Sequence, residues 1–561
     1  MKLKEVKTRQ DLATYIGLPL RYLTYVLYEK NTAEMYRTFE IPKKSGGSRK
    51  ISAPNSELNE ILKKFSVKLY KELKQIRKEN NINQNVSHGF EEGKYFITNA
   101  SNHTSKKCLL NVDLEDFFGS IHFGRVRGYF NKNKHFDLPI EIATMIAQLT
   151  CFNKCLPQGA PTSPVISNLI CSIIDTRIAK LSRKFRLNYT RYVDDLSFST
   201  NDYKFELNHE RFLLDLEKII TDSGFKINKN KIRFNDKFHR HEVTGIIVNK
   251  KVNIRRDYYR ENRALAHTYY KTGEVLINGK KGTFEQLEGR FSFINQITKY
   301  NNKNDKNTKH DAFNLNGVER EYQKLLAYKY YFNLIQPLIV TEGKTDSLYI
   351  KAALKNMYTE YTMLIQRENG IDDFDYLFSF LNRTRRLRYF FDLSENGAHT
   401  FKNIYQVYSE TQNNKYRNFP KIKEFASLSS SVPKHPVILL LDNEVGKDRP
   451  LRTLLNEMKI TEEFTDYINV IDNLYILKIP NLSGKDNVEI ENLFSDDLLK
   501  RDFNGKTLNL SDKYNKDSQI GKDKFSKYVY RNYKEIDFSN FKPLLNSLIA
   551  LIEDYQRKIE T

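Results

Sequence analysis

The chain has 561 residues, so it is too long for one hydrophobic core, and we expect roughly two to four domains. Its formal net charge is +22 and its pI is about 9.4. Hydrophobic residues form 40% of it, which excludes a disordered chain. The basic excess with abundant Tyr and Phe favours a nucleic-acid partner over a basic protein with ordinary aromatic cores. Its four cysteines lack paired spacing, which excludes a zinc ribbon or a disulfide framework and fits a reducing cytoplasm.

The N-terminal segment, residues 1–30, is expected to form a small helical cap. Thr8 precedes a helical pattern as its capping residue, and Gly17 ends that pattern. The first residues lack the apolar run of a signal peptide, and no stretch of the chain is long enough to cross a bilayer. We therefore expect a soluble, cytoplasmic protein without a membrane partner.

Two strand-like runs, residues 36–42 and 49–53, flank the Gly-rich basic sequence KKSGGS and predict a hairpin. A flexible tip that carries Lys43, Lys44 and Arg49 can close over a triphosphate. A solvated basic turn is the alternative that the local sequence leaves open. An amphipathic helix is expected to follow over residues 58–76.

Two acidic strand ends are the centre of the pattern. Residues 109–118 (LLNVDLEDFF) predict a strand that carries Asp113, and residues 188–199 (NYTRYVDDLSFS) predict a β-hairpin with Asp194 and Asp195 at its tip. Ionised carboxylates are rarely buried without a partner, and a divalent cation is a partner that three of them can share. For the hairpin taken alone, a surface Asp-Asp turn is the alternative.

A third motif lies between these two. Residues 156–164 (LPQGAPTSP) lead into an apolar helix expected over residues 165–174. Gln158 and Gly159 precede the start of this helix, where free backbone N–H groups and a side-chain amide can orient a template and a nucleotide.

Further motifs follow the acidic hairpin. Residues 224–231 (GFKINKNK) are basic and can form a strand, and residues 242–249 (EVTGIIVN) follow them. A helix is then expected over residues 263–272, where Gly273 stops it.

These motifs, in this order, resemble those of reverse transcriptases. Asn99 and Ala100 followed by His103 resemble the Asn-Ala-x-x-His element of retron enzymes, and the Val-Thr-Gly sequence at 243–245 resembles a second retron element. The resemblance covers residues 1–298 and implies a right-hand polymerase of fingers, palm and thumb.

The resemblance also implies roles for single residues. Phe118 would lie beneath the sugar and exclude a ribose 2′-hydroxyl, so that deoxynucleoside triphosphates are the expected substrates; a core residue is the alternative. Lys231 would protonate the departing pyrophosphate, with Lys229 as a rival, and Asp116 is read as a helix-start charge. The implied ligands of two Mg²⁺ ions are Asp113, the Leu114 carbonyl, Asp194 and Asp195. The implied nucleotide-binding residues are Arg49, Leu114, Phe118, Gln158 and Lys231. The implied nucleic-acid contacts are Asn99, His103, Val243, Thr244, Gly245, Arg255 and Arg256.

Retron enzymes bind a dedicated structured noncoding RNA, prime from one of its 2′-hydroxyls and leave a branched RNA–DNA product. They serve in bacterial anti-phage defence, usually with an effector. The resemblance implies the same partners here and a bacterial cytoplasm. A reverse transcriptase of another lineage, such as a mobile-element or untemplated defence polymerase, and an RNA-scaffolding protein whose second half only binds nucleic acid stay open as alternatives. A homo-oligomer is also left open.

The chain changes character after residue 298. Residues 299–310 (KYNNKNDKNTKH) are polar and predict a linker, and an aromatic helix is expected over residues 319–334. Residues 389–393 (YFFDL) are read as a further sheet strand.

A second set of acidic strand ends appears in this half. Residues 337–346 (PLIVTEGKTD) predict a buried strand that ends at Glu342, and residues 436–444 (PVILLLDNE) repeat the pattern with Asp442 and Glu444. Continuous apolar strands that alternate with helices predict a parallel α/β sheet, whose ligands gather at the carboxyl ends of its strands. Carboxylates that meet there are a site for a hard cation. A solvated acidic loop cluster is the weaker alternative.

This half resembles the Toprim fold of topoisomerases, primases and OLD-family nucleases. Glu342 to Asp346 match its Glu-Gly-x-x-Asp motif, whereas Asp442-Asn-Glu444 departs from its Asp-x-Asp by one methylene. The resemblance implies a nuclease in which Glu342 is the general acid/base, acting on either DNA or RNA. The implied ligands of one or two Mg²⁺ ions are Glu342, Asp346, Asp442, Glu444 and Glu491. For Glu491, a helix-start residue is the alternative.

We therefore expect an α+β right-hand polymerase followed by an α/β Toprim domain with a mainly parallel sheet. The expected domains are a helical cap at 1–30, fingers and palm at 31–240, a thumb at 241–298, a linker and connecting helix at 299–334, the Toprim domain at 335–498 and a basic helical C-terminal extension at 499–561.

Overall fold

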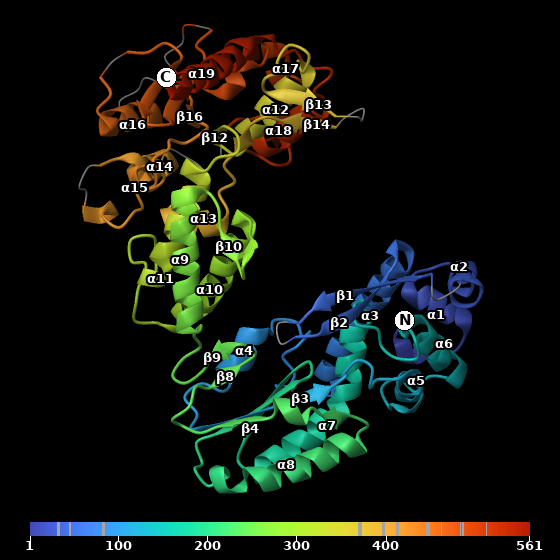
Figure 1. Ribbon diagram of the computed structural model, residues 1–561. Coiled ribbons are helices and arrows are strands. Elements are labelled where there is room, and N and C mark those ends of the chain that lie inside the picture. The colour runs from blue at the N-terminus through green and yellow to red at the C-terminus, as the bar shows by residue number, and fades with distance from the viewer. Residues whose placement is uncertain are drawn as a thin grey trace. The chain divides into compact units, whose positions relative to one another are not determined.

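The computed structural model describes residues 1–30, 34–43, 46–80, 85–368, 373–394, 399–410, 414–444, 449–461, 463–482, 484, 487–511 and 513–560. Two compact units divide the chain, Met1–Arg255 and Arg256–Thr561 (Figure 1). This border falls inside the predicted thumb, because the helices expected there pack within the second unit. In the described ranges, no helix is both long and apolar enough to cross a membrane.

The first unit begins with the predicted helices. Thr8 accepts a hydrogen bond from the Asp11 N–H at the start of α1 (Arg9–Ile16), and Gly17 ends this helix in the left-handed conformation at φ +86°. The short helix α2 (Leu20–Thr24) follows.

The predicted hairpin and the helix after it are both confirmed. Strands β1 (Tyr36–Pro42) and β2 (Ser48–Pro54) pair antiparallel along their whole length, and Asn55 caps α3 (Ser56–Glu79). Of the Gly-rich tip between the strands, residues 44 and 45 lie outside the described residues.

An antiparallel sheet forms the centre of the first unit. Its strand order is β4-β5-β3-β6, and β7 also pairs with β3. Helices α7 and α8 pack against this sheet and share its hydrophobic core (Figure 1). The elements are β3 (Cys108–Glu115), β4 (Asn188–Tyr192), β5 (Asp195–Thr200), β6 (Lys226–Ile227), β7 (Arg233–Asn235), α7 (Ser163–Lys184) and α8 (Phe205–Asp222). The remaining elements of this unit are α4 (Phe96–Ser101), α5 (Phe123–Lys132), α6 (Ile140–Thr150), β8 (Glu242–Val243) and β9 (Ile246–Ile247).

A buried arginine fixes the turn between β4 and β5. Arg191 is 1% exposed, and its Nε and Nη2 each donate to the Asp175 carboxylate on α7 at 2.8 Å. Its Nη1 donates to the Val193 carbonyl at 3.0 Å. Val193 has a φ of +61°, a left-handed conformation that is unfavourable for a β-branched residue. Arg191 therefore stabilises a strained turn that the local sequence disfavours.

The second unit begins with helices α9 (Arg256–Thr272), α10 (Phe284–Asn304) and α11 (Gly317–Ala327), with a short hairpin, β10 (Leu276–Ile277) and β11 (Lys280–Lys281), between the first two. The linker prediction is wrong for residues 299–304, because α10 continues through them. The Asn302 amide donates to Glu319 at 2.7 Å and ties α10 to α11.

A five-stranded sheet organises the rest of the second unit, in the order β15-β12-β16-β19-β18. The first four strands are parallel and β18 joins antiparallel at the edge. The strands are β12 (Leu338–Thr341), β15 (Ser379–Phe380), β16 (Val437–Leu441), β18 (Tyr467–Ile471) and β19 (Leu474–Lys478). The two buried strands predicted around residues 337–346 and 436–444 are confirmed as β12 and β16.

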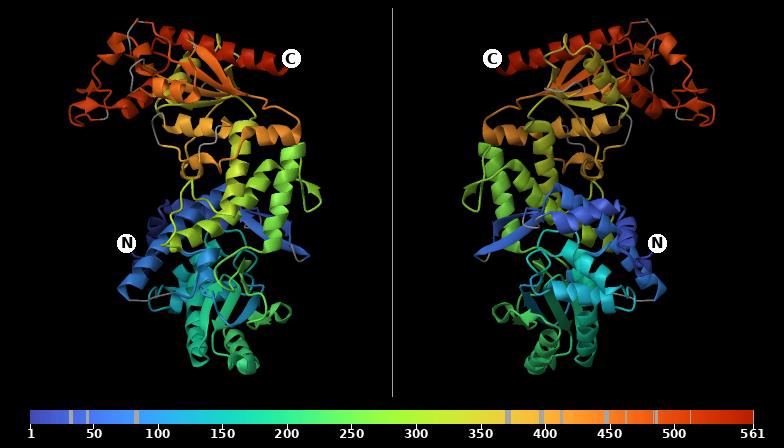
Figure 2. Two further views of the ribbon diagram at one scale, coloured as in Figure 1. Left: turned by 90° about the vertical axis from the view of Figure 1, so that its left-hand side faces the viewer. Right: turned by 90° about the vertical axis from the view of Figure 1, so that its right-hand side faces the viewer.

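Successive residues of β16 point into two different cores, one on each face of the sheet. Helix α19 (Lys542–Glu560) lies along one face and supplies Leu545, Leu548 and Leu551 to its core (Figure 2). The predicted C-terminal extension, residues 499–561, contains helices, as expected, and α19 covers the sheet of a domain that was expected to end at residue 498. The apolar residues of this helix recur at helical spacing, and that stripe needs a sheet face to cover it.

The strand predicted at residues 389–393 is also wrong. Residues 385–391 form helix α13 (Arg385–Phe391), which ends where Asp392 adopts a φ of +52°. A short apolar run fits a buried helix turn as well as a strand, and periodicity cannot separate the two. The other elements of this unit are α12 (Asp346–Asn356), β13 (Ile365–Arg367), β14 (Phe374–Tyr376), α14 (His399–Tyr408), α15 (Ile422–Ser429), β17 (Asn443–Glu444), α16 (Pro450–Met458), β20 (Asn487–Val488), α17 (Asp496–Leu499), β21 (Thr507–Leu508), β22 (Gln519–Ile520) and α18 (Lys522–Arg531).

The buried pair of Arg191 and Asp175 gives a prediction for stability. Replacing Asp175 by Ala leaves the guanidinium buried and unpaired, which is expected to cost about 3–5 kcal/mol of unfolding free energy. Urea unfolding of the full chain measures this loss. The matched control is Glu60→Gln, which breaks the solvated pair with Lys64 and should change stability by less than ~0.5 kcal/mol. Equal, small effects of both substitutions would contradict the role given to Arg191.

Candidate active sites

The antiparallel register of β3 and β5 brings the first set of carboxylates together. Asp113 and Asp195 are directly opposite each other in this pairing, and Asp194 lies in the turn next to them. The Leu114 N–H donates to the Asp194 carbonyl at 3.0 Å and holds the turn against β3. The three aspartates that the sequence places far apart are thus neighbours in the fold.

Their charges are poorly compensated. Burial, followed by repulsion from Asp194 and Asp113, raises the pKa of Asp195 to about 7. Burial and the charge of Asp113 also raise the pKa of Asp194. Lys231 forms the ion pair of this site: its Nζ lies 2.9 Å from Asp113 Oδ1, and this hydrogen bond raises the pKa of Lys231.

No group of three or more His, Cys, Asp or Glu side chains stands in a metal-binding arrangement in the described part of the chain. In the first site, Asp113 is instead bonded to Lys231 and is also a hydrogen-bonding neighbour of Asp195. The donor chemistry still fits a hard divalent cation, because three carboxylates with unfavourable mutual repulsion occupy one strand end.

The predicted nucleotide-binding residues lie on elements around these carboxylates. Arg49 is on β2, close enough for its charge to lower the pKa of Asp194. The Gln158 carbonyl accepts a hydrogen bond from the Ser52 N–H at 2.8 Å, so the Leu-Pro-Gln-Gly turn is fixed to β2. Gly159 has a φ of +132°, and a Cβ there would lie 2.9 Å from the Ser52 carbonyl oxygen, which explains the glycine.

Phe118 lies half-buried in the turn after β3. Its ring contacts Phe117 edge to face, with the ring centroids 5.2 Å apart. Phe117 stacks in turn on Phe225, at 5.7 Å between centroids. This aromatic row fixes the position of Phe118 near the end of β3.

The prediction of direct nucleic-acid contact is wrong for Asn99, His103 and Val243, because all three side chains are buried. His103 instead bonds the hydroxyls of Ser199 and Thr190, at 2.7 Å each, and so joins β4 to β5. Asn99 is wholly buried on α4.

The other predicted nucleic-acid contacts are placed differently. Thr244 donates to the Phe96 carbonyl at 3.1 Å and forms with Gly245 the turn between β8 and β9, where both residues have positive φ. Arg255 and Arg256 are exposed, in a stretch that joins the two units.

The second set of carboxylates gathers at the carboxyl ends of β12 and β16. The Glu342 side chain is half-buried, and its Oε2 has no hydrogen-bond partner among the described residues. Asp346 at the start of α12 accepts from the Gly343 N–H at 2.8 Å. Asp442 accepts from the Ile490 N–H at 3.1 Å. Glu444, next along β17, forms an ion pair with Arg449 at 3.1 Å.

Burial and mutual repulsion also raise pKa values in this second cluster. Burial raises the pKa of Asp346 to about 7 and raises the pKa of Asp442 well above its ordinary value, with Asp346 and Glu342 adding to the second shift. Burial also raises the pKa of Glu342 and of Glu491. The cluster therefore shares two properties with the first site, because it is acidic and partly desolvated.

Sequence reasoning missed the cations beside this cluster. Lys522, at the start of α18, bonds Glu489 at 2.8 Å and Glu491 at 3.3 Å. Arg383 donates to the carbonyls of Thr341 and Glu342 at the end of β12. Glu489 was missed too, and only its proximity to Glu491 in the sequence pointed to it. Nothing local in the sequence links Lys522 to residues more than thirty positions away.

Comparisons with known proteins agree with the first unit. The family profile "Reverse transcriptase (RNA-dependent DNA polymerase)" matches residues 41–248, which contain all three aspartates. The fold and site thus define the class as reverse transcriptase.

Two curated relatives identify the group of reverse transcriptases to which the chain is similar. The Retron Ec86 reverse transcriptase of Escherichia coli is 32% identical over 276 residues, which are 49% of this chain and 76% of that protein. The Retron Mx65 reverse transcriptase of Myxococcus xanthus is 28% identical over 308 residues, 52% of this chain and 68% of that protein. The chain belongs to the retron reverse transcriptases, which are RNA-directed DNA polymerases.

Among solved structures, a telomerase from Candida albicans with a fragment of telomeric RNA is similar at a TM-score of 0.30 and 11% identity. The match covers 52% of this chain and 60% of the telomerase chain. A likeness of this size does not define a shared fold.

The buried His103 gives a pH-dependent prediction. Burial lowers its pKa to about 3, so the folded protein holds it neutral while the unfolded chain protonates it near its ordinary value. The stability it contributes is complete above about pH 6.5 and is lost as the pH falls from there toward about 3, at ~1.4 kcal/mol per pH unit. Urea unfolding at several pH values should show that the unfolding free energy of His103→Gln falls less steeply with decreasing pH than that of the wild type. The matched control is His267→Gln, an exposed position on α9, which should leave the slope unchanged; equal slopes for all three proteins would contradict the assignment.

Proposed function

We propose that the first unit copies part of a cognate structured noncoding RNA into branched single-stranded DNA, and that the second unit is a Toprim nuclease-like effector for anti-phage defence. The observation that carries the first half is the register of β3 and β5, which sets Asp113 opposite Asp195. Family membership supports the polymerase, and the second half is supported by the acidic cluster at the ends of two parallel strands.

The carboxylates of Asp113, Asp194 and Asp195, with the Leu114 carbonyl, would hold the metal. Two bound Mg²⁺ ions would activate the attacking hydroxyl and neutralise the triphosphate, as in two-metal phosphoryl transfer. The protein supplies the three anionic oxygens and keeps them close despite their repulsion. Lys231 neutralises Asp113 until a cation and substrate enter.

The residues around the carboxylates would position the substrate. Arg49, on the exposed hairpin of β1 and β2, binds the phosphates of the incoming nucleotide. Gln158 orients the nucleotide and the template. The Phe118 ring closes the space that a ribose 2′-hydroxyl requires and so selects deoxynucleotides. Lys231 is then the proton donor to pyrophosphate.

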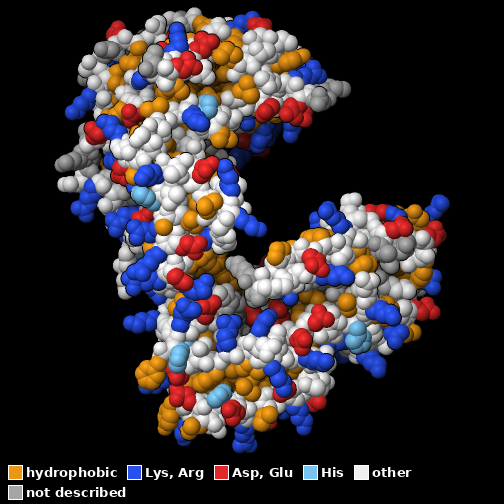
Figure 3. Space-filling view, in the orientation of Figure 1, with side chains coloured by type: hydrophobic (Ala, Val, Ile, Leu, Met, Phe, Trp, Pro, Cys, Tyr) orange, Lys and Arg blue, Asp and Glu red, His pale blue; other side chains and the backbone are white. Residues whose placement is uncertain are grey.

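The priming hydroxyl and the template would come from the same RNA. The charge of +22 provides the long-range attraction for that RNA. Figure 3 shows Lys and Arg side chains spread over helices α9 and α11 of the second unit, where phosphates can be bound without base recognition. The exposed Arg255 and Arg256 precede and begin α9 and are assigned to the same contact.

In the second unit, Glu342 would act as general acid/base. Its unpartnered Oε2 and its raised pKa suit a group that exchanges a proton during phosphodiester cleavage. The proposed ligands of one or two Mg²⁺ ions are Glu342, Asp346, Asp442, Glu444 and Glu491. The nuclease would be restrained while the RNA–DNA complex is intact.

The polymerase proposal is tested on the purified full chain. Asp194→Asn and Asp195→Asn should each lower primer extension on an RNA template by about 10³-fold, or ~4 kcal/mol, because one ligand of the metal pair is lost. Asp116→Asn is the matched control, since this exposed neighbour of the same motif should keep activity within about twofold. Sequencing of co-purified nucleic acid should reveal a 2′,5′-branched product. Undiminished extension by either active-site variant would remove the catalytic assignment.

The effector proposal is tested by cleavage assays with Mg²⁺ on single- and double-stranded DNA and RNA. Glu342→Gln should lower cleavage by at least about 10²-fold, and the exposed Asp497→Asn should not change it. In cells, Asp113→Asn abolishes the DNA product and should make the protein more toxic, while the double variant with Glu342→Gln should be harmless. Cleavage that persists in Glu342→Gln, or toxicity independent of it, would overturn the proposal.

A further inference from the structure

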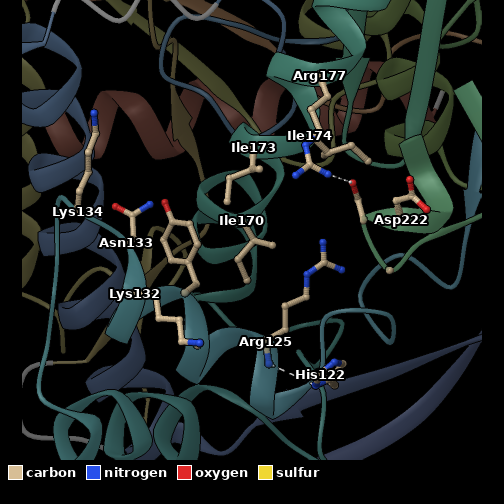
Figure 4. Close-up of a pocket in the computed structure, with 14 residues that line it drawn as sticks. His122, Arg125, Lys132, Asn133, Lys134, Ile170, Ile173, Ile174, Arg177 and Asp222 are labelled. Atoms are coloured by element: carbon tan, nitrogen blue, oxygen red, sulfur yellow. Dashed lines mark hydrogen bonds between the residues drawn. The ribbon is translucent and has the colours of Figure 1, made fainter. Parts of the chain in front are cut away.

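A second concave site lies in the first unit, and none of the three aspartates lines it. It is a cavity of about 670 Å³ between helices α5 and α7 and the turn that follows α8. This volume is within the range of about 300–1,000 Å³ of small-molecule sites. Figure 4 shows the side chains that surround it.

The cavity is basic. Arg125, Lys132 and Lys134 line it from α5 and the segment after it, and Arg177 lines it from α7. Asp222 is the one carboxylate in its lining, so positive charge dominates. An anion is the ligand that this balance favours.

The Arg125 side chain points into the cavity (Figure 4), and one of its hydrogen-bond donors is unsatisfied by the described residues. Its guanidinium lies over the Phe225 ring, at 4.1 Å from the centroid, which fixes its plane. Its Nη1 is buried and has no acceptor among the described residues. A buried donor without an acceptor is unfavourable, and a phosphate oxygen in the cavity would satisfy it. The Arg177 guanidinium, on the same side of the cavity, donates to the Ser223 hydroxyl at 3.4 Å.

The rest of the wall is apolar and aromatic. Ile170 and Ile173 lie beside the two guanidinium groups (Figure 4), and Tyr129 completes the lining. Ile173 is 50% exposed and is therefore accessible to a ligand in the cavity. Apolar and aromatic side chains beside an anion-binding end match a ligand that has a ring system and a phosphate.

We propose that this cavity binds one nucleotide, with its phosphate on Arg125 and Arg177 and its base against Ile173 and Tyr129. The nucleotide can be a free nucleoside phosphate or an unpaired nucleotide of a bound RNA; the recognition chemistry is the same. The site needs no metal and none of the carboxylates of the polymerase site, so it does not depend on the proposed copying reaction.

The test uses the full chain in EDTA, which removes metal-dependent binding at the polymerase site. The probes are AMP, inorganic phosphate and a short single-stranded RNA that carries 5-bromouridine for photocrosslinking. Affinities come from calorimetry, and crosslinked peptides from mass spectrometry. The variants are Ile173→Glu and Arg177→Gln. Their matched controls are Ile140→Glu, which is 52% exposed on α6, and the exposed Arg211→Gln on α8.

A free nucleotide is supported if both cavity variants bind AMP at least about tenfold more weakly, or by ~1.4 kcal/mol, and the controls do not. A crosslink to the peptide that contains Tyr129, lost in the cavity variants, supports an RNA nucleotide when AMP does not bind. Inorganic phosphate that binds as tightly as AMP overturns the assignment of a base. The site is overturned if AMP does not bind and no crosslink responds to the two cavity variants. Primer extension by the wild type with Mg²⁺, measured in parallel, reports separately on the proposed copying activity.

Discussion

The polymerase site depends on one buried ion pair. Arg191 links Asp175 on α7 to the carbonyl of Val193, and so anchors a turn whose backbone conformation is unfavourable for valine. The turn carries the two carboxylates that face Asp113. Without that anchor, repulsion between three acidic groups would favour a relaxed turn with the carboxylates apart. The helix that follows the Leu-Pro-Gln-Gly motif thus positions the acidic hairpin through a single guanidinium.

The two acidic clusters share a physical logic on different sheets. Each sits at strand ends, where side chains from neighbouring strands meet, and each is buried enough to raise carboxylate pKa values. Each also has a lysine close by, Lys231 in the first and Lys522 in the second. The lysines lessen the repulsion without filling the site, which leaves both clusters suited to a divalent cation.

Local sequence was sufficient for the two hairpins, for β3, β12 and β16, and for the acidic positions, because periodicity, Gly-rich tips and paired carboxylates are short-range signals. Local sequence failed where tertiary packing determines the secondary structure or the burial of a side chain. The resemblance of its motif to a retron element predicts a nucleic-acid contact for His103, but this side chain is buried and bonds two hydroxyls on β4 and β5. The run at 389–393 predicts a strand and residues 299–310 predict a linker, but residues 389–391 belong to α13 and residues 299–304 to α10. Arg191, Asp175 and Lys522 carry no sequence signature, since their roles come from partners distant in the chain.

The central claim is that three dispersed aspartates form one cation site. The most direct test counts bound Mn²⁺ by electron paramagnetic resonance in the wild type, in Asp113→Asn and in Glu342→Gln, with the full chain and no nucleotide. The account predicts that Asp113→Asn loses the ions of the first unit and keeps those of the second, whereas Glu342→Gln does the reverse. An Asp113→Asn protein that binds as much Mn²⁺ as the wild type would contradict it.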